Sequence, residues 1–252
     1  MIERYSKEKV AIINPSDFVK KIGGMPEIAI ACYSHVLFDK IIEKYQGEVI
    51  GELDYTDTVK KIYRIEYKGK RYAMFMMSVG APAAATCIED VHAMGANKFI
   101  VFGNCGVLDK NVADLAIIIP NKAIRGDGLS YHYIEDSLFI DINKKYSNVF
   151  KRILNNKGYS YVEGTTWTTD AFYRETKEKV IKMKNNGAIC VEMEAAALQA
   201  VCDFRGIDLM TFFYAADNLD NDYWEKRSLS GNERVEDKIL VMELALELAR
   251  EM

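Results

Sequence analysis

Two closely spaced glutamates are the first candidates for chemistry in this sequence. Glu192 and Glu194 open a predicted helix whose interior is mostly alanine. Carboxylates in the first turn of a helix are favoured by its dipole, and that structural role alone explains both residues. A functional role is the alternative, because a carboxylate at a helix start can accept hydrogen bonds from two neighbouring hydroxyl groups. Since residues two apart on a helix point in different directions, we expect the two glutamates to differ in role.

Asp217 follows the long apolar run Leu209–Ala216, which predicts a buried strand. An acidic side chain at the end of such a strand can be partly desolvated. Desolvation raises the pKa of a carboxyl group, so Asp217 is a possible proton donor. An Asx turn, in which its side chain bonds the backbone that follows, is an equally good interpretation. Both interpretations stay open from the residues alone.

The segment Gly103-Asn104-Cys105-Gly106 follows a second apolar run, Phe99–Phe102. Its glycines would let backbone amides approach a ligand, and successive amides can bind an anion. The pattern differs from the dinucleotide-binding fingerprint, and a tight turn at a strand end is the simpler interpretation. Three further polar candidates are expected in loops: Arg125, His132 and Arg174.

The elements that position these residues are predicted from apolar periodicity. Continuous apolar runs predict strands at 28–32, 62–67, 72–77, 99–102, 115–119 and 208–216. Helical spacing predicts helices at 36–45, 84–94, 142–154, 193–204 and 235–249. The alternation predicts an α/β fold, namely a mixed, mostly parallel central sheet flanked by helices. We expect a single domain over 1–252, with 1–26 as an N-terminal lead-in.

In sheets of this kind, ligands bind beyond the carboxyl ends of the strands. Three segments are expected there, namely Ser34-His35, Gly103–Gly106 and Ala216–Asn218. This rule selects one edge of the sheet as the site.

Composition narrows the possible partners. With 33 basic and 37 acidic residues, the net charge is −4, and no stretch is basic enough for nucleic acid. The five scattered cysteines form no C-x-x-C pair, which argues against a zinc site and favours a reducing compartment. The apolar runs are too short to span a bilayer. We therefore expect a cytoplasmic protein with no metal, no membrane partner and no nucleic-acid partner.

Several motifs occur in a fixed order along the chain, and Val191–Ala196, with the sequence Val-Glu-Met-Glu-Ala-Ala, is the most specific of them. The others are Ser78–Pro82 followed by Glu89, Gly103–Gly106, Ala123–His132, Thr169–Tyr173 and Ala216-Asp217. In this order they resemble the nucleoside phosphorylase family of hexameric purine nucleoside phosphorylases, uridine phosphorylases and methylthioadenosine/adenosylhomocysteine nucleosidases. The resemblance runs from about Ile28 to the C-terminal helix.

The resemblance implies roles for individual residues. Glu194 would bind the ribose hydroxyls with Met193 and Glu192 beside it. Phe172 would stack near the base, with Arg174 as a further base contact. Asp217 would be the catalytic acid that protonates or hydrogen-bonds N7 of a purine. The segment Ala123–His132 is closer to the uridine branch, so purine is favoured and uridine stays possible.

The chain departs from the family at the phosphate site. The Gly-Asp-Pro-x-Arg loop of the family is replaced by Cys32–Leu37, and Val101 stands where a second arginine is expected. A third arginine, from a neighbouring subunit, falls near Thr58, with Arg64 close by. The remaining candidates for binding phosphate or another anion are Ser34, His35, Gly103 and Asn104.

The resemblance implies phosphorolysis of a nucleoside, with phosphate as co-substrate and no further cofactor, by a homo-oligomer (dimer or hexamer). Two alternatives follow from the missing arginines, which normally supply charge-assisted bonds to phosphate. One is a nucleoside hydrolase using water, although the early glutamate of the nucleosidase branch is absent after the first strand. The other is a non-catalytic nucleoside-binding protein.

Overall fold

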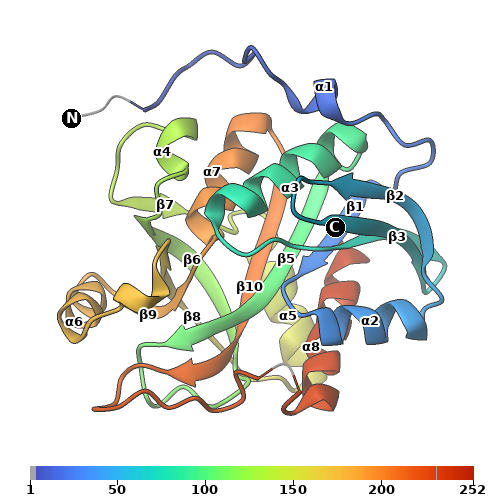
Figure 1. The fold of residues 1–252 in the computed structure, drawn as a ribbon. Helices are drawn as coiled ribbons and strands as arrows, with labels where there is room; N and C mark the ends of the chain where they lie inside the picture. The colour runs from blue at the N-terminus through green and yellow to red at the C-terminus, as the bar shows by residue number, and fades with distance from the viewer. Residues whose placement is uncertain (1–3, 231) are drawn as a thin grey trace.

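A ten-stranded sheet lies at the centre of the computed structural model, which describes residues 4–230 and 232–252 (Figure 1). The strands are β1 (Ile28–Cys32), β2 (Glu48–Asp54), β3 (Val59–Tyr67), β4 (Lys70–Met76), β5 (Lys98–Val107), β6 (Ile117–Gly126), β7 (Phe139–Asp141), β8 (Tyr161–Thr169), β9 (Ala188–Glu192) and β10 (Asp208–Asn218). The helices are α1 (Pro15–Phe18), α2 (His35–Lys44), α3 (Ala81–Met94), α4 (Ser130–Tyr133), α5 (Ser147–Lys157), α6 (Lys177–Asn185), α7 (Ala195–Arg205) and α8 (Val235–Ala249), with the 3-10 helix η1 (Phe172–Arg174).

The strand order is β10-β6-β8-β9-β5-β1-β4-β3-β2. Strands β4, β1, β5 and β10 pair in parallel, and the hairpin of β3 and β4 adds antiparallel pairing at the edge. Because β10 pairs with both β5 and β6, strands β5, β10, β6, β8 and β9 close into a ring. The predicted α/β class with a mixed central sheet flanked by helices is confirmed.

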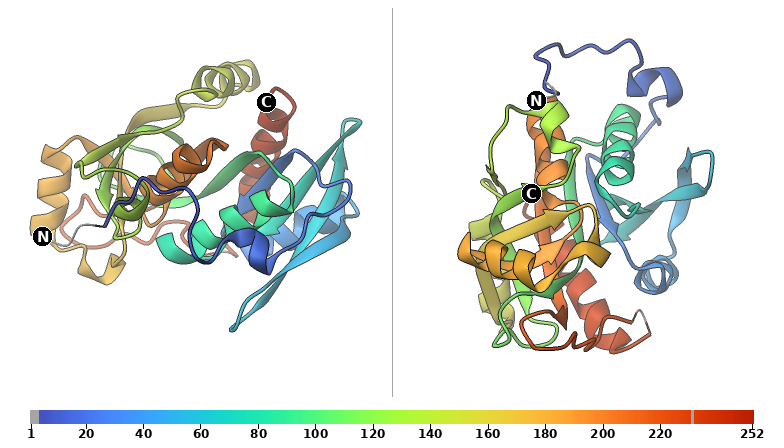
Figure 2. Two further views of the ribbon diagram at one scale, coloured as in Figure 1. Left: turned by 90° about the horizontal axis from the view of Figure 1, so that it is seen from above. Right: turned by 60° about the vertical axis from the view of Figure 1, so that its left-hand side comes forward.

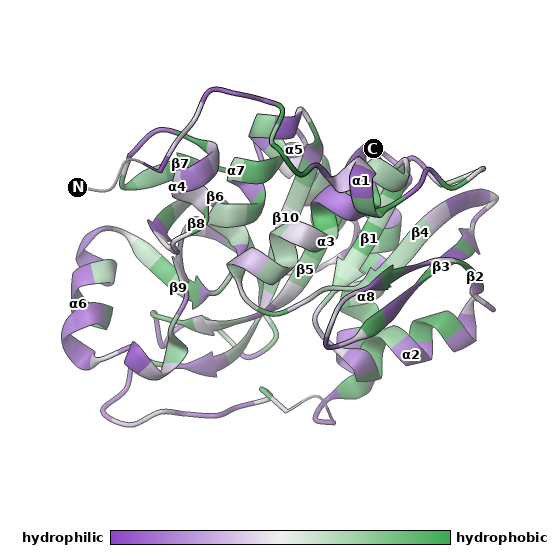
Figure 3. Ribbon diagram, turned by 45° about the horizontal axis from the view of Figure 1, so that its top comes forward, coloured by the Kyte–Doolittle hydropathy of each residue, from purple (hydrophilic) through white to green (hydrophobic). Residues whose placement is uncertain are grey.

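Helices cover both faces of the sheet (Figure 2). Helices α3 and α7 contact each other on one face, and α8 contacts α2 and α5 on the other. The sheet is hydrophobic on both faces because each packs against helices. Figure 3 shows β1, β5 and β10 coloured mainly hydrophobic, whereas α6 is largely hydrophilic. The described part of the chain contains no helix with the length and apolarity needed to cross a bilayer.

The sheet extends further than its apolar runs predict. Strand β6 continues past Pro120 to Gly126, with a register shift between Pro120 and Lys122 that accommodates the proline. Arg125 therefore lies within a strand and not in a loop. It is buried, and its guanidinium donates hydrogen bonds to the Ser130 hydroxyl and the Glu135 carbonyl oxygen, so it holds the α4 segment.

Strands β8 and β9 were missing from the predicted set. Strand β8 contains four threonines among its nine residues, so its apolar signal is weak. Strand β9 is short and runs directly into the Val-Glu-Met-Glu-Ala-Ala motif. Both strands matter because they hold the first glutamate of that motif.

Candidate functional site

The carboxyl ends of β1, β5 and β10 meet at one edge of the sheet. Cys32 is the register partner of Phe102, and Asp217 is the partner of Gly106. Two cavities open there, of about 210 Å³ and 830 Å³. The larger one has the size typical of a pocket for a small organic ligand. The structure therefore brings together the three segments selected from the sequence.

The segment Gly103–Gly106 is neither a turn nor a loop, because β5 continues through it and pairs with β10. The glycines make room for neighbouring side chains. A Cβ atom on Gly103 would lie 2.8 Å from Cδ2 of Tyr33. A Cβ atom on Gly106 would lie 2.5 Å from Cδ1 of Leu219 and 3.2 Å from Oδ1 of Asp217. Both glycines thus let site residues approach the strand backbone.

Glu194 lies at the N-terminus of α7 and lines the larger cavity, with only 8% of its surface exposed. Its Oε1 accepts a hydrogen bond from the Gly80 backbone N–H at 2.6 Å. Gly80 has φ 92°, a conformation that favours glycine, and belongs to the Ser78–Pro82 motif. Burial, followed by the charge of Glu192, raises the pKa of Glu194 to about 8.

Glu192 is the last residue of β9, and its carboxylate points into the protein. Oε1 accepts hydrogen bonds from the Thr166 and Thr168 hydroxyls, and Oε2 accepts from the backbone N–H groups of Glu194 and Ala195. These four bonds use the acceptor capacity of a carboxylate. Glu192 thus caps α7 and fixes Glu194 in place. Glu192 also lines the larger cavity, and its contact with ribose stays a prediction.

Asp217 faces the larger cavity from β10, next to a register shift in the pairing with β5. Its Oδ2 accepts a hydrogen bond from Nε1 of Trp224 at 2.8 Å. Burial raises the pKa of Asp217, and Trp224 and Arg227 oppose that rise. The Asx turn belongs to the next residue, since Oδ1 of Asn218 accepts from the Asp220 backbone N–H. Asp217 is thus left facing the cavity as a partly desolvated acid.

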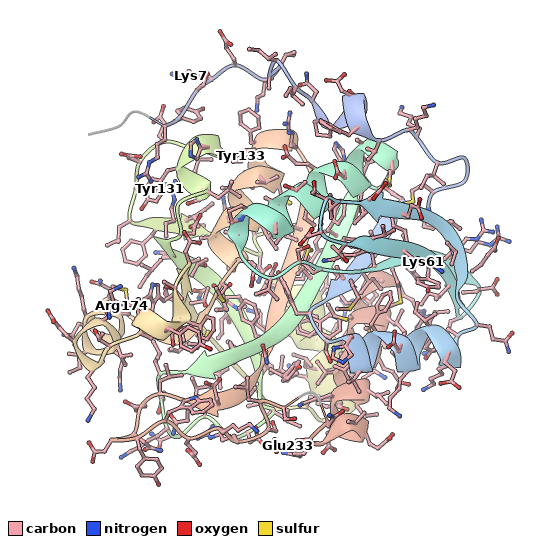
Figure 4. All side chains as sticks on the ribbon, in the orientation of Figure 1. Lys7, Lys61, Tyr131, Tyr133, Arg174 and Glu233 are labelled. Atoms are coloured by element: carbon pink, nitrogen blue, oxygen red, sulfur yellow. The ribbon has the colours of Figure 1, made fainter. Side chains whose placement is uncertain are left out.

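Glu175 also lines this cavity and was missed in the sequence. Burial, followed by the charge of Asp217, raises the pKa of Glu175 to about 7. Arg174, by contrast, is exposed and lines neither cavity, so its contact with a base stays a prediction. Figure 4 shows Arg174 at the outer edge of the molecule. In this segment, Glu175 lines the cavity and Arg174 does not.

Apolar and aromatic side chains surround the mouth of the larger cavity. Phe172 is 50% exposed there, with its ring 3.9 Å from that of Tyr173 between centroids. Met193 lies half-buried between the two glutamates of its motif. Tyr223 and Trp224 line the cavity from the segment after β10. Exposed rings at a cavity mouth are suited to stacking on a planar base.

The smaller cavity holds the predicted anion-binding residues Ser34, His35, Gly103 and Asn104. Ser34 caps α2, since its hydroxyl oxygen accepts from the backbone N–H at the helix start. Among the described residues, the lining contains no arginine and no lysine. Arg64 lies in β3 and donates to the Glu48 carboxylate at 2.6 Å. His132 lies in α4 and lines neither cavity. Residues 4–230 and 232–252 contain no cluster of potential metal ligands.

Comparison with known proteins places this chain in a family. A family model described as "Phosphorylase superfamily" matches residues 27–252. A DeoD-type purine nucleoside phosphorylase of Bacillus cereus (strain B4264) is 25% identical over 200 residues, covering 75% of this chain and 80% of the relative.

Solved structures share the fold. A uridine phosphorylase from Vibrio fischeri ES114 has a TM-score of 0.77 at 20% identity, over 92% of this chain and 95% of its own. A futalosine hydrolase mutant of Helicobacter pylori strain 26695 has a TM-score of 0.71 at 18% identity, over 90% of this chain and 100% of its own. Since the family model covers most of the sequence, the chain belongs to the phosphorylase superfamily.

Proposed function

We propose that the protein cleaves the N-glycosidic bond of a purine nucleoside with phosphate, giving the free base and ribose 1-phosphate. The observation that carries this proposal is one cavity lined by both Glu194 and the partly desolvated acid Asp217. The relative of 25% identity, a purine nucleoside phosphorylase, supports it.

The two acids would divide the reaction between them. Cleavage passes through a cation-like sugar, so the enzyme must stabilise positive charge and neutralise the departing base. Glu194 would hold the ribose hydroxyls, whose hydrogen bonds favour its ionised form, and place that negative charge beside the sugar. Asp217 would donate a proton to N7 of the purine as the bond breaks. Phosphate would enter from the smaller cavity, through Ser34, His35, Asn104 and backbone amides.

Hydrolysis is a second candidate, favoured by the anion end of the site. No guanidinium or ammonium group lines the smaller cavity within the described part of the chain, so phosphate would bind weakly there. A futalosine hydrolase shares the fold, which supports water as an alternative acceptor. A nucleoside-binding protein without activity is the third candidate.

Phosphate dependence separates these candidates. We expect purine base release to rise at least about 10-fold when millimolar phosphate is added, because phosphate must supply the attacking oxygen. The measurement offers purine and pyrimidine nucleosides with and without phosphate and quantifies the base and ribose 1-phosphate formed. Equal release without phosphate would establish hydrolysis, and nucleoside binding with no release would establish the binding protein.

A Glu175→Gln variant should move the alkaline limb of the pH profile to lower pH. A proton donor must keep its proton, so activity falls once the site has lost the proton that Asp217 delivers. Burial, helped by the ionised Asp217, raises the Glu175 pKa to about 7, so the pair of acids holds its last proton up to about that pH. Without Glu175 that proton is held by Asp217 alone and is lost at lower pH, so the alkaline limb of kcat/KM should move by roughly half a unit to one unit.

The matched control is Glu178→Gln, which removes the same charge from an exposed position three residues away in α6. That variant should keep the wild-type pH profile. A Glu175→Gln profile that overlays the wild type would show that Glu175 does not act on the proton donor.

We also propose a cytoplasmic location and a homo-oligomeric assembly. The five cysteines are free and buried, which is compatible with a reducing compartment. Exposed apolar side chains on the N-terminal segment, including Ile12 and Phe18, offer contact area for a second copy. Sedimentation of the purified protein would measure the assembly.

A further inference from the structure

Tyr33 carries a buried hydroxyl group with no hydrogen-bond partner among the described residues. Buried polar groups are nearly always paired, so each exception needs an explanation. Tyr72, Ser147 and Thr211 are similar exceptions, but these residues line neither cavity. Tyr33 lines both. The unpaired O–H group of Tyr33 therefore belongs to a residue of the candidate site.

The tyrosine ring is held where the two cavities meet. It follows β1 and lies against the backbone of Gly103. Any residue larger than glycine at position 103 would leave no room for the ring. Its hydroxyl lies close enough to Glu194 and Glu192 for their charges to raise its pKa further above the value that burial sets. The hydroxyl consequently stays protonated and remains a hydrogen-bond donor.

Glu194 supplies the complementary acceptor in the same cavity. Among the described residues, the backbone N–H group of Gly80 is its hydrogen-bond donor. A carboxylate can accept about four hydrogen bonds, so acceptor capacity remains. A ligand hydroxyl is both donor and acceptor, and one placed between Tyr33 and Glu194 would satisfy both.

We propose that the Tyr33 hydroxyl donates a hydrogen bond to a ribose hydroxyl, which in turn donates a hydrogen bond to Glu194. The identity of the sugar rests on the proposed function, whereas the unpaired donor does not. Tyr33 is thus a second ribose-binding residue beside Glu194. Its ring separates the cavity proposed for the sugar from the smaller cavity proposed for phosphate. An amide or hydroxyl left unpaired by burial is destabilising, so the ligand relieves that penalty when it binds.

The test combines a protein change with a change in the ligand. Tyr33→Phe removes the hydroxyl and keeps the ring against Gly103. Adenosine, 2′-deoxyadenosine and 3′-deoxyadenosine are the probes, and dissociation constants are measured in phosphate-free buffer, or KM values if base is released there. We expect Tyr33→Phe to weaken adenosine binding about 10-fold. The loss should disappear for the deoxynucleoside that lacks the contacted hydroxyl.

Tyr72→Phe is the matched control, since it removes another buried, unpaired hydroxyl from a strand that lines neither cavity. It should leave all three dissociation constants unchanged. Equal losses for all three ligands, or no loss, would overturn the proposal. A Tyr33→Phe effect confined to the KM for phosphate would also overturn the proposal, because it would assign the hydroxyl to phosphate binding.

The proposed function fails separately from this inference. Wild-type protein that binds nucleosides but releases no base contradicts the function, while the pattern of binding losses still decides the role of Tyr33. Wild-type protein that binds no nucleoside contradicts both.

Discussion

Glu194→Gln is expected to lower kcat/KM for a purine nucleoside by about 10²-fold to 10³-fold. Glutamine keeps the size and the Gly80 contact of the side chain but removes its negative charge. Its amide nitrogen is also a hydrogen-bond donor, so it cannot accept a hydrogen bond from a ribose hydroxyl. Initial rates over a range of nucleoside concentrations measure the loss. Activity within about threefold of wild type would remove Glu194 from the ribose site.

The same change is expected to stabilise the fold above neutral pH. Burial and the neighbouring Glu192 raise the Glu194 pKa from 4.5 to about 8. Between these values the unfolded chain releases its proton while the folded protein keeps it. The contribution of Glu194 to the free energy of unfolding is therefore fully present below about pH 4.5 and is lost as pH rises towards 8. Glutamine does not titrate, so the loss is absent from the variant.

The Glu194→Gln variant should gain about 1–3 kcal/mol in free energy of unfolding at pH 8, which corresponds to several degrees in Tm. At pH 5 the gain should be near zero. Denaturation at both pH values measures it. Glu66→Gln is the control, because Glu66 is exposed in β3 and should give no pH-dependent gain. A Glu194→Gln protein that is less stable than wild type at pH 8 would show that the charge is compensated in the folded state.

The sequence could predict the edge of the sheet but not the contacts made there. Strands β1, β5 and β10 are long apolar runs, and parallel strands bring their carboxyl ends together. Glu194 receives its backbone donor from Gly80, 114 positions earlier. Such a contact has no local pattern, so composition and spacing could not distinguish a helix-opening carboxylate from a ligand-binding one.

The surroundings of the site acids depend on the same long-range contacts. The resemblance places Glu192 beside the ribose, whereas the contacts of its carboxylate come partly from the β8 threonines, which donate to one of its oxygens. Glu175 was overlooked beside Arg174 because the direction of each side chain depends on the turn of η1. Local periodicity identifies elements, but the ring of strands decides which side chains share a cavity.

Asp217→Asn is expected to lower kcat for purine nucleosides by about 10²-fold to 10³-fold with little change in KM. Asparagine can still accept the Trp224 Nε1–H bond through its oxygen, so the side chain should stay in place. It cannot transfer a proton to the departing base. Steady-state rates for adenosine and inosine measure the effect. Unchanged kcat would show that the base leaves without the help of Asp217.

A 7-methylguanosine substrate distinguishes proton transfer from positioning. Methylation at N7 gives the base a positive charge before the bond breaks, so it leaves without protonation. If Asp217 acts as the acid, Asp217→Asn should cleave 7-methylguanosine at a rate close to that of the wild type. If Asp217 only orients the base, the variant should lose activity on this substrate as well. Because burial raises the Asp217 pKa, the acid is available nearer neutral pH than an exposed aspartate would be, and we expect rescue by methylation.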